Sequence, residues 1–160
     1  MEVTGGPTRP TGWRRMLFRA PIVVYRVHLG AVLGTRFVLL HHTGRVSGRP
    51  RQSVVEVVAL DDRTGAITVA SGFGPRSDWY LNVLARPHLE VDLGRRRLAV
   101  GATALREEEA AAAMADYGRR HPRAGRELCR YMGMTVDGST TDFEAAGRRI
   151  PMLRLTPTGG

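Results

Sequence analysis

The chain has 160 residues, which suits a single domain with one core. Its net charge of +9 comes from 24 arginines against 15 acidic residues, and it contains no lysine. The absence of lysine excludes Schiff-base chemistry and a Walker-type phosphate loop, and the single cysteine excludes a disulfide framework and a cysteine-based zinc site. The charge favours an acidic partner, which leaves nucleic acid, an anionic membrane and an acidic small molecule open.

Residues 1–12 predict a flexible N-terminus, and residues 13–160 predict one domain that opens with an amphipathic helix over 13–33. Arginines gather on one side of this helix and aliphatic residues on the other. Two interpretations stay open: a helix that caps the core, and a helix that lies on a membrane surface. Charges interrupt the apolar run too often for a bilayer span or a signal peptide.

The rest of the chain predicts strands joined by tight turns, with helices between and after them. Apolar, β-branched runs predict strands over 36–41, 53–60, 66–70, 88–93, 97–105 and 152–155. Turn signals over 61–65 and 94–96 predict hairpins. Helical patterns cover 78–86, 107–118 and 122–131, and a short final helix follows the polar loop 137–142. This pattern predicts an α+β fold, a small antiparallel β-barrel with flanking helices.

Two loops carry most of the functional signal. The first, TGRVSGRPR over 43–51, combines two glycines with three arginines between apolar strands. Arginine binds phosphate or carboxylate bidentately, and glycine allows close backbone approach, so this loop suits an anion; a plain basic turn is the alternative. The second, SGFGPRSDWY over 71–80, leads into a helix N-terminus that favours an anion. It also offers flat aromatic surfaces for a heterocycle.

Other residue patterns in the chain give weaker functional signals. His41 and His42 are adjacent in a predicted strand and face opposite sides, so they predict no metal site. Arg95, Arg96 and Arg97 fit a solvated hairpin tip better than a nucleic-acid contact. The chain has no Gly-x-Ser-x-Gly elbow of a serine hydrolase.

The motifs TGRVSGRPR and VASGFGPRSDWYLNVLARPHLEV, followed by GRRHPRA, resemble the deazaflavin-dependent nitroreductase family of flavin and deazaflavin oxidoreductases. The resemblance runs from about residue 38 to about residue 124. It implies a split β-barrel that binds coenzyme F-420, an 8-hydroxy-5-deazaflavin with an acidic phosphate and glutamyl tail; FMN is the less favoured cofactor. This chain lacks the tyrosine cluster that some nitroreducing relatives have near residues 121–124, which argues against drug-type nitroreduction.

The resemblance also implies which residues bind the cofactor. Arginines of the first loop would contact the acidic tail, the loop's small residues would frame it, and the second loop and helix would line the deazaflavin ring. These residues are Thr43, Gly44, Arg45, Ser47, Gly48, Arg49, Arg51, Ser71, Gly74, Arg76, Trp79 and Asn82.

A reduced deazaflavin supplies the two-electron chemistry, so the protein needs to position the acceptor and to provide a proton donor. Tyr117, His121 and Tyr131 are the candidate donors, each of which is also explained by ordinary helix packing or exposure. The leading function is hydride transfer from reduced F-420 to an apolar or conjugated acceptor: a quinone, an enone, a nitroaromatic or a lipid-like molecule. The alternatives are a deazaflavin carrier and a basic membrane- or nucleic-acid-binding barrel.

We expect a cytoplasmic protein, monomeric or homodimeric, with a possible peripheral membrane contact through 13–33 and no nucleic acid as its partner.

Overall fold

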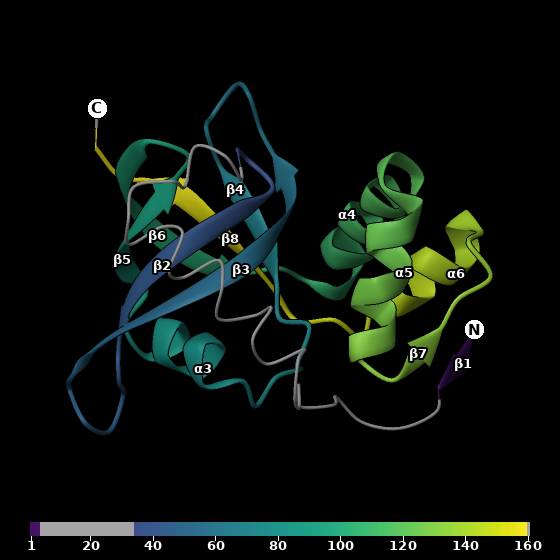
Figure 1. Cartoon of the computed structure of the whole chain (residues 1–160), viewed down its shortest axis with the longest axis horizontal. Coiled ribbons are helices and arrows are strands. Elements are labelled where there is room, and N and C mark those ends of the chain that lie inside the picture. Colours follow the sequence, from purple (N-terminus) through teal and green to yellow (C-terminus); the bar gives the residue numbers. More distant parts are fainter. Residues whose placement is uncertain (4–33, 160) are drawn as a thin grey trace.

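The computed structural model describes residues 1–3 and 34–159. Its centre is a closed barrel of six antiparallel strands in the order β2, β3, β4, β8, β6, β5 (Figure 1). The strands are β2 (Phe37–Thr43), β3 (Pro50–Leu60), β4 (Ile67–Ala70), β5 (His88–Leu93), β6 (Arg96–Ala104) and β8 (Met152–Pro157). The helices are α3 (Asp78–Ala85), α4 (Glu107–Arg120), α5 (Pro122–Tyr131) and α6 (Thr140–Gly147). The predicted α+β split-barrel fold is confirmed.

Two hairpins of the barrel turn at glycines whose φ lies in the left-handed region. Gly65 has φ 75° in the β3–β4 turn, and Gly94 has φ 62° in the β5–β6 turn. The Asp61 carboxylate accepts a hydrogen bond from the backbone N–H of Arg63 at 2.9 Å and holds the first turn. Glycine adopts this conformation without the steric cost that other residues carry, so both hairpins form where the sequence predicted them.

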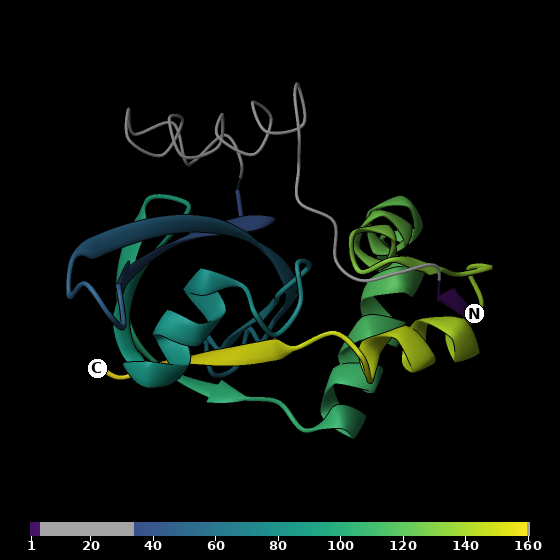
Figure 2. The same cartoon turned by 90° about the horizontal axis from the view of Figure 1, so that it is seen from below.

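The interior of the barrel is filled by alternate residues of its strands. Val38 and Leu40 of β2 and Val55 of β3 are buried there, since side chains alternate between the two faces of a strand. Helix α3 lies across one mouth of the barrel (Figure 2) and adds Tyr80 and Val83 to the same core. The barrel is therefore packed, and α3 is fixed to it by its buried face.

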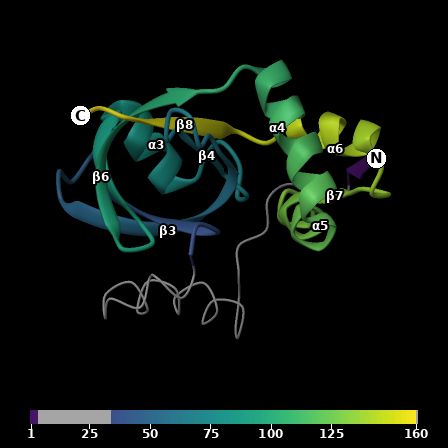
Figure 3. The ribbon, with the colours of Figure 1, turned by 90° about the horizontal axis from the view of Figure 1, so that it is seen from above.

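Helices α4, α5 and α6 pack together beside the barrel and enclose a second core (Figure 3). Met114 of α4, Leu128 of α5 and Phe143 of α6 are almost fully buried in it. Gly147 brings α6 close to α4, because a Cβ atom at this position would lie 2.6 Å from the carbonyl oxygen of Ala110. Contact of this kind fixes the spacing of the two helices.

Strand β3 contributes to both cores. Its pairing with β4 shifts register between Val57 and Ala59, and Val57 is buried in the barrel core while Val58 is buried in the helical core. Glu56 shares the outward face with Val58, because residues two apart on a strand point the same way. Strand β3 thus presents polar chemistry to the space between barrel and helices.

The first residues of the chain form a strand that the sequence did not predict. Strand β1 (Glu2–Val3) pairs antiparallel with β7 (Met134–Thr135) next to α6. Residues 2–3 lie within the stretch 1–12 predicted as a flexible N-terminus; their pairing has no signal in the sequence, because two isolated residues do not show a backbone partner. Residues 4–12 and the predicted helix over 13–33 lie outside the described part of the chain.

Candidate cofactor and acceptor site

The loop that joins β2 to β3 is closed by its own backbone. The N–H of Gly44 donates to the carbonyl of Arg49 at 2.9 Å, and the N–H of Gly48 donates to the carbonyl of Gly44 at 2.8 Å. Gly48 has φ 68°, and a Cβ atom at Gly44 would collide with the Ser47 hydroxyl. Gly48 is therefore favoured by its left-handed conformation, and a side chain at Gly44 would have to displace the Ser47 hydroxyl.

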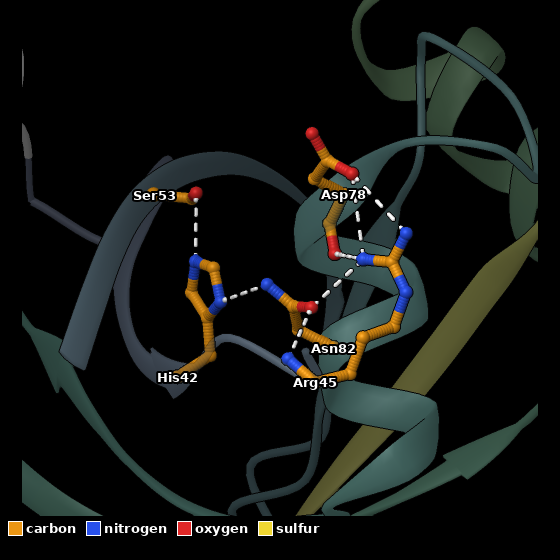
Figure 4. Close-up of polar contacts among 5 residues, drawn as sticks. All are labelled: His42, Arg45, Ser53, Asp78 and Asn82. Carbon is orange, nitrogen blue, oxygen red and sulfur yellow. Dashed lines mark hydrogen bonds and ion pairs between the residues drawn. The ribbon is translucent and has the colours of Figure 1, made fainter. Parts of the chain in front are cut away.

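Asn82 of helix α3 fastens this loop to the barrel mouth (Figure 4). Its Oδ1 accepts hydrogen bonds from the backbone N–H of Arg45 at 3.0 Å and from Arg45 Nη1 at 2.9 Å. The Arg45 guanidinium also pairs with Asp78 Oδ1 at 3.3 Å. Because the Asp78 side chain is 88% exposed, this ion pair is weak and competes poorly with a bound anion.

His42 lies next to Asn82 and is buried. Asn82 Nδ2 donates to His42 Nδ1 at 3.2 Å, so the ring proton belongs on Nε2, which donates to the Ser53 hydroxyl at 3.0 Å. Burial, reinforced by the nearby charge of Arg51, lowers the pKa of His42 from 6.5 to about 4. A neutral imidazole at physiological pH therefore supports the Asn82 amide in one orientation.

These groups surround a cavity of about 430 Å³ at the barrel mouth, which we call the arginine cavity. Arg45 and Arg51 give it positive charge, and Trp79 gives it a flat apolar wall. Within the described part of the chain, Arg51 makes no salt bridge. The full set of lining residues is His42, Gly44, Arg45, Val46, Ser47, Arg51, Gln52, Ser53, Asp78, Trp79 and Asn82.

A second cavity, of about 100 Å³, lies between the outer face of β3 and helix α5. We call it the aromatic cavity, because Phe37, Phe73, Trp79 and Tyr131 line it. The rings of Phe73 and Tyr131 lie 5.7 Å apart between centroids. Trp79 lines both cavities, and the β3 residues of the arginine cavity end where those of the aromatic cavity begin, so the two sites adjoin. Glu56 also lines the aromatic cavity.

Glu56 is hydrogen-bonded to Tyr117, which lines a third cavity of about 220 Å³ together with Arg120, His121 and residues of β3; we call it the Tyr117 cavity. The Tyr117 hydroxyl donates a short hydrogen bond to Glu56 Oε1, and Arg36 Nη2 lies 4.0 Å from the same oxygen. Burial raises the pKa of Glu56, although Tyr117, Arg36 and His121 each lower it. Burial and the adjacent Glu56 raise the pKa of Tyr117.

The structure gathers half of the predicted cofactor residues around one cavity and leaves the others elsewhere. Those that line the arginine cavity are Gly44, Arg45, Ser47, Arg51, Trp79 and Asn82. Arg49 and Arg76 are exposed outside it, and the φ of Gly48 serves the turn. Thr43 ends β2. Ser71 is buried and donates to the Gly74 carbonyl at 2.7 Å, which shapes the second loop.

The three candidate proton donors do not share one cavity. Tyr131 lies in the aromatic cavity, whereas Tyr117 and His121 line the Tyr117 cavity. Tyr117 is 2% exposed and is more buried than the half-buried helix residue that its ordinary interpretation predicts. His121 is exposed at the end of α4, and its ring lies 5.4 Å from that of Tyr117.

Sequence reasoning missed Glu56, Ser53 and the supporting role of His42. The only signal for Glu56 was a charged residue inside an otherwise apolar strand, SVVEVVAL over 53–60. His42 was considered with His41 as a metal ligand, and the two do point to opposite faces. His41 pairs with Asp92 Oδ2 at 2.7 Å on the outside of the barrel. Within residues 1–3 and 34–159, no cluster of three His, Cys, Asp or Glu side chains is arranged to hold a metal ion.

The chain is thus a closed six-stranded barrel with an arginine-lined cavity at its mouth and an adjoining aromatic cavity. Residues 13–129 match the model of the family described as F420H(2)-dependent quinone reductase, and the chain belongs to this family. The protein is therefore an oxidoreductase whose expected cofactor is coenzyme F-420.

Solved structures share the fold at low sequence identity. An F420-H2 dependent reductase (FDR-A) is 22% identical with a TM-score of 0.51, and the match covers 75% of this chain and 93% of that chain. A protein described as a domain-swapped dimer is 21% identical with a TM-score of 0.54, covering 88% and 98%. A pyridoxamine 5'-phosphate oxidase-related, FMN binding protein from Nostoc punctiforme is 16% identical with a TM-score of 0.52, covering 94% and 83%. A comparison with curated proteins found no match.

Proposed function

We propose that the protein transfers a hydride from reduced coenzyme F-420 to a quinone or a related conjugated acceptor. The observation that carries this proposal is the direct adjacency of the arginine cavity and the aromatic cavity, which share Trp79. An acidic tail in the first cavity and a flat ring system extending toward the second would satisfy both linings at once. The family description supports a quinone as the acceptor.

The residues of the arginine cavity fit the cofactor chemically. Arg51 and Arg45 offer bidentate donors to phosphate and carboxylate oxygens. The tight turn at Gly44 and Gly48 uses its own N–H groups internally and holds the loop in one shape beside the cavity, so the arginine side chains would make the contacts to an anion. Asn82 holds Arg45 in place before any ligand arrives, which reduces the ordering cost of binding.

The reduced cofactor supplies the hydride, and the chain orients the partners and excludes water. Phe37, Phe73 and Tyr131 offer an apolar, aromatic surface for a conjugated acceptor. A quinone, an enone and a nitroaromatic all have a planar π-system that suits such a surface. These three acceptors differ in size and in the atom that becomes anionic after hydride transfer. Their rates of turnover therefore distinguish them.

The experiment titrates the protein with coenzyme F-420 and with FMN at two salt concentrations, and then offers reduced F-420 with a quinone, an enone, a nitroaromatic and an alkylated quinone. We expect tighter, salt-sensitive binding of F-420 and the fastest turnover with a quinone. Tighter binding of FMN would contradict the cofactor assignment. Binding of F-420 without turnover of any acceptor would favour the carrier instead.

We also propose a homodimer in solution, supported by the fold relative described as a domain-swapped dimer. Sedimentation equilibrium tests it, and a monomer mass at all concentrations would contradict it. None of the helices among the described residues is long and apolar enough to cross a bilayer. The peripheral membrane contact concerns 13–33 and stays a prediction, as does the cytoplasmic location.

A further inference from the structure

We propose that Glu56 is the proton donor of the aromatic cavity, and that Tyr117 is the residue that positions it. This inference rests on the proposed function, because a hydride acceptor must also gain a proton to become a neutral product. The three candidates chosen from the sequence did not include Glu56. Its place in the aromatic cavity, hydrogen-bonded to Tyr117, singles it out.

The position of Glu56 suits this role. It stands on the outward face of β3 opposite Phe37 of β2, and its side chain is 19% exposed. Of the described residues that line the aromatic cavity, only Glu56 and Tyr131 have an acidic proton. Burial raises the pKa of Glu56 from the ordinary range of a carboxyl group toward neutral pH, whereas a tyrosine hydroxyl is a much weaker acid, so Glu56 is the better donor near neutral pH.

The groups that face Glu56 stabilise its carboxylate once the proton has left. From α4, the Tyr117 hydroxyl donates to Oε1; from the segment before β2, Arg36 lies 4.0 Å from that oxygen. His121 adds a favourable charge from the end of α4 when it is protonated, and Tyr131 faces the same cavity from α5. Burial acts in the opposite direction, and it raises the pKa of Glu56 so that the group retains its proton to higher pH.

With a quinone as the acceptor, proton transfer from Glu56 completes the reduction. The acceptor gains a hydride from the reduced cofactor, which is thereby oxidised. The O–H bond of Glu56 breaks, and a new O–H bond forms at the acceptor oxygen that became anionic. The hydroquinone leaves, and the Glu56 carboxylate takes a proton from water. Tyr117, which is hydrogen-bonded to the carboxyl group, also lines the Tyr117 cavity with His121.

The first measurement uses the cofactor-free protein and no turnover. The carboxyl carbons of glutamate are labelled with 13C, and their NMR shifts are followed with pH in the wild type, Glu56→Gln and Tyr117→Phe. We expect one carboxyl to titrate above the ordinary range of glutamate, to vanish in Glu56→Gln and to move to higher pH in Tyr117→Phe. The last shift follows because Tyr117 stabilises the carboxylate. The chain has eight glutamates. If all eight carboxyls titrate in the ordinary range in the wild type, the proposal is overturned.

The second measurement is kinetic. Glu56→Gln should still bind F-420, because Glu56 is absent from the arginine cavity that would hold the acidic tail, and its kcat should fall about 100-fold, the lower end of the effect of a general acid. The wild-type kcat should fall at alkaline pH, and this fall should occur at higher pH in Tyr117→Phe. The matched control is Glu109→Gln, which changes a carboxylate that pairs with Arg106 and Arg154. Its kcat and pH profile should match those of the wild type.

The outcomes separate the two proposals. A wild type that fails to bind F-420 would reject the proposed function. A wild type that binds and turns over while Glu56→Gln keeps its kcat and its pH profile would reject only the role of Glu56. A loss of turnover in Tyr131→Phe with none in Glu56→Gln would also reject it and would assign the proton to Tyr131.

Discussion

Asn82 Oδ1 accepts two hydrogen bonds from Arg45, one from its backbone N–H at 3.0 Å and one from its guanidinium at 2.9 Å. One amide oxygen thus fixes both the path of the β2–β3 loop and the direction of its side chain. Asn82 is 5% exposed and is itself held by neutral His42. A residue of helix α3 therefore controls the charge that faces the arginine cavity.

We expect Asn82→Ala to weaken F-420 binding by about tenfold, which corresponds to about 1.4 kcal/mol. The variant frees Arg45 and leaves His42 Nδ1 without its donor. Fluorescence titration measures the affinity. Leu84→Ala, an exposed change on the same helix, is the control and should bind as the wild type does. Equal affinity in Asn82→Ala and the wild type would contradict the anchoring role.

Arg51→Ala should weaken F-420 binding by roughly 1.5 to 3 kcal/mol, because it removes charge-assisted hydrogen bonds. Arg49→Ala is the matched comparison, since it removes the same charge two residues away, outside the cavity. We expect Arg49→Ala to lose less binding free energy than Arg51→Ala, and we expect salt to remove a larger fraction of that loss. Similar losses in both variants would mean that binding depends on the overall field and not on the cavity.

His42 should make the protein less stable in mild acid. The pKa of His42 is 6.5 in the unfolded chain and about 4 in the folded protein, so between these values only the unfolded chain binds the proton. The stabilisation is complete above pH 6.5 and falls as the pH falls toward 4, by at most about 3 kcal/mol. Urea unfolding of the wild type and His42→Gln at pH 7, 5.5 and 4.5 measures it. Parallel curves for the two proteins would contradict the assignment.

Gly147→Ala should lower the free energy of unfolding by roughly 1 to 3 kcal/mol through overpacking between α6 and α4. The new Cβ atom would lie 2.6 Å from the Ala110 carbonyl oxygen and 2.7 Å from Ala111 Cα, and backbone atoms yield little. Thermal unfolding measures the change. Gly159→Ala, which meets no atom within 4 Å, is the control. A more stable Gly147→Ala would mean that helix propensity exceeds the steric cost.

The sequence predicted the barrel well, because its strands carry local signals. Apolar, β-branched runs separated by Gly65 and Gly94 locate hairpins without knowledge of the rest of the fold. Strand β1 had no such signal, since two residues that pair with Met134–Thr135 form a contact between distant parts of the chain. The start of β3 at Pro50, earlier than predicted, likewise follows from pairing with β2.

The site was harder to predict, because its cavities depend on which residues meet across the fold. Composition and glycine spacing located the first loop, yet they could not separate Arg51 in the cavity from Arg49 outside it. Tyr117 was a candidate from its residue type alone. Its partner Glu56 lies 61 residues earlier in the chain, and only the packing of α4 against β3 brings the two together.

The two adjoining cavities have walls of different origin. The arginine cavity is built by the β2–β3 loop and α3, whereas the outer wall of the aromatic cavity includes Leu128 and Tyr131 of α5. Substitutions in the α5 wall can therefore change the range of acceptors while the residues of the arginine cavity stay the same. For the protein engineer, a library restricted to Leu128 and Tyr131, the α5 residues that line the aromatic cavity, is the route to new substrates for the same reductant.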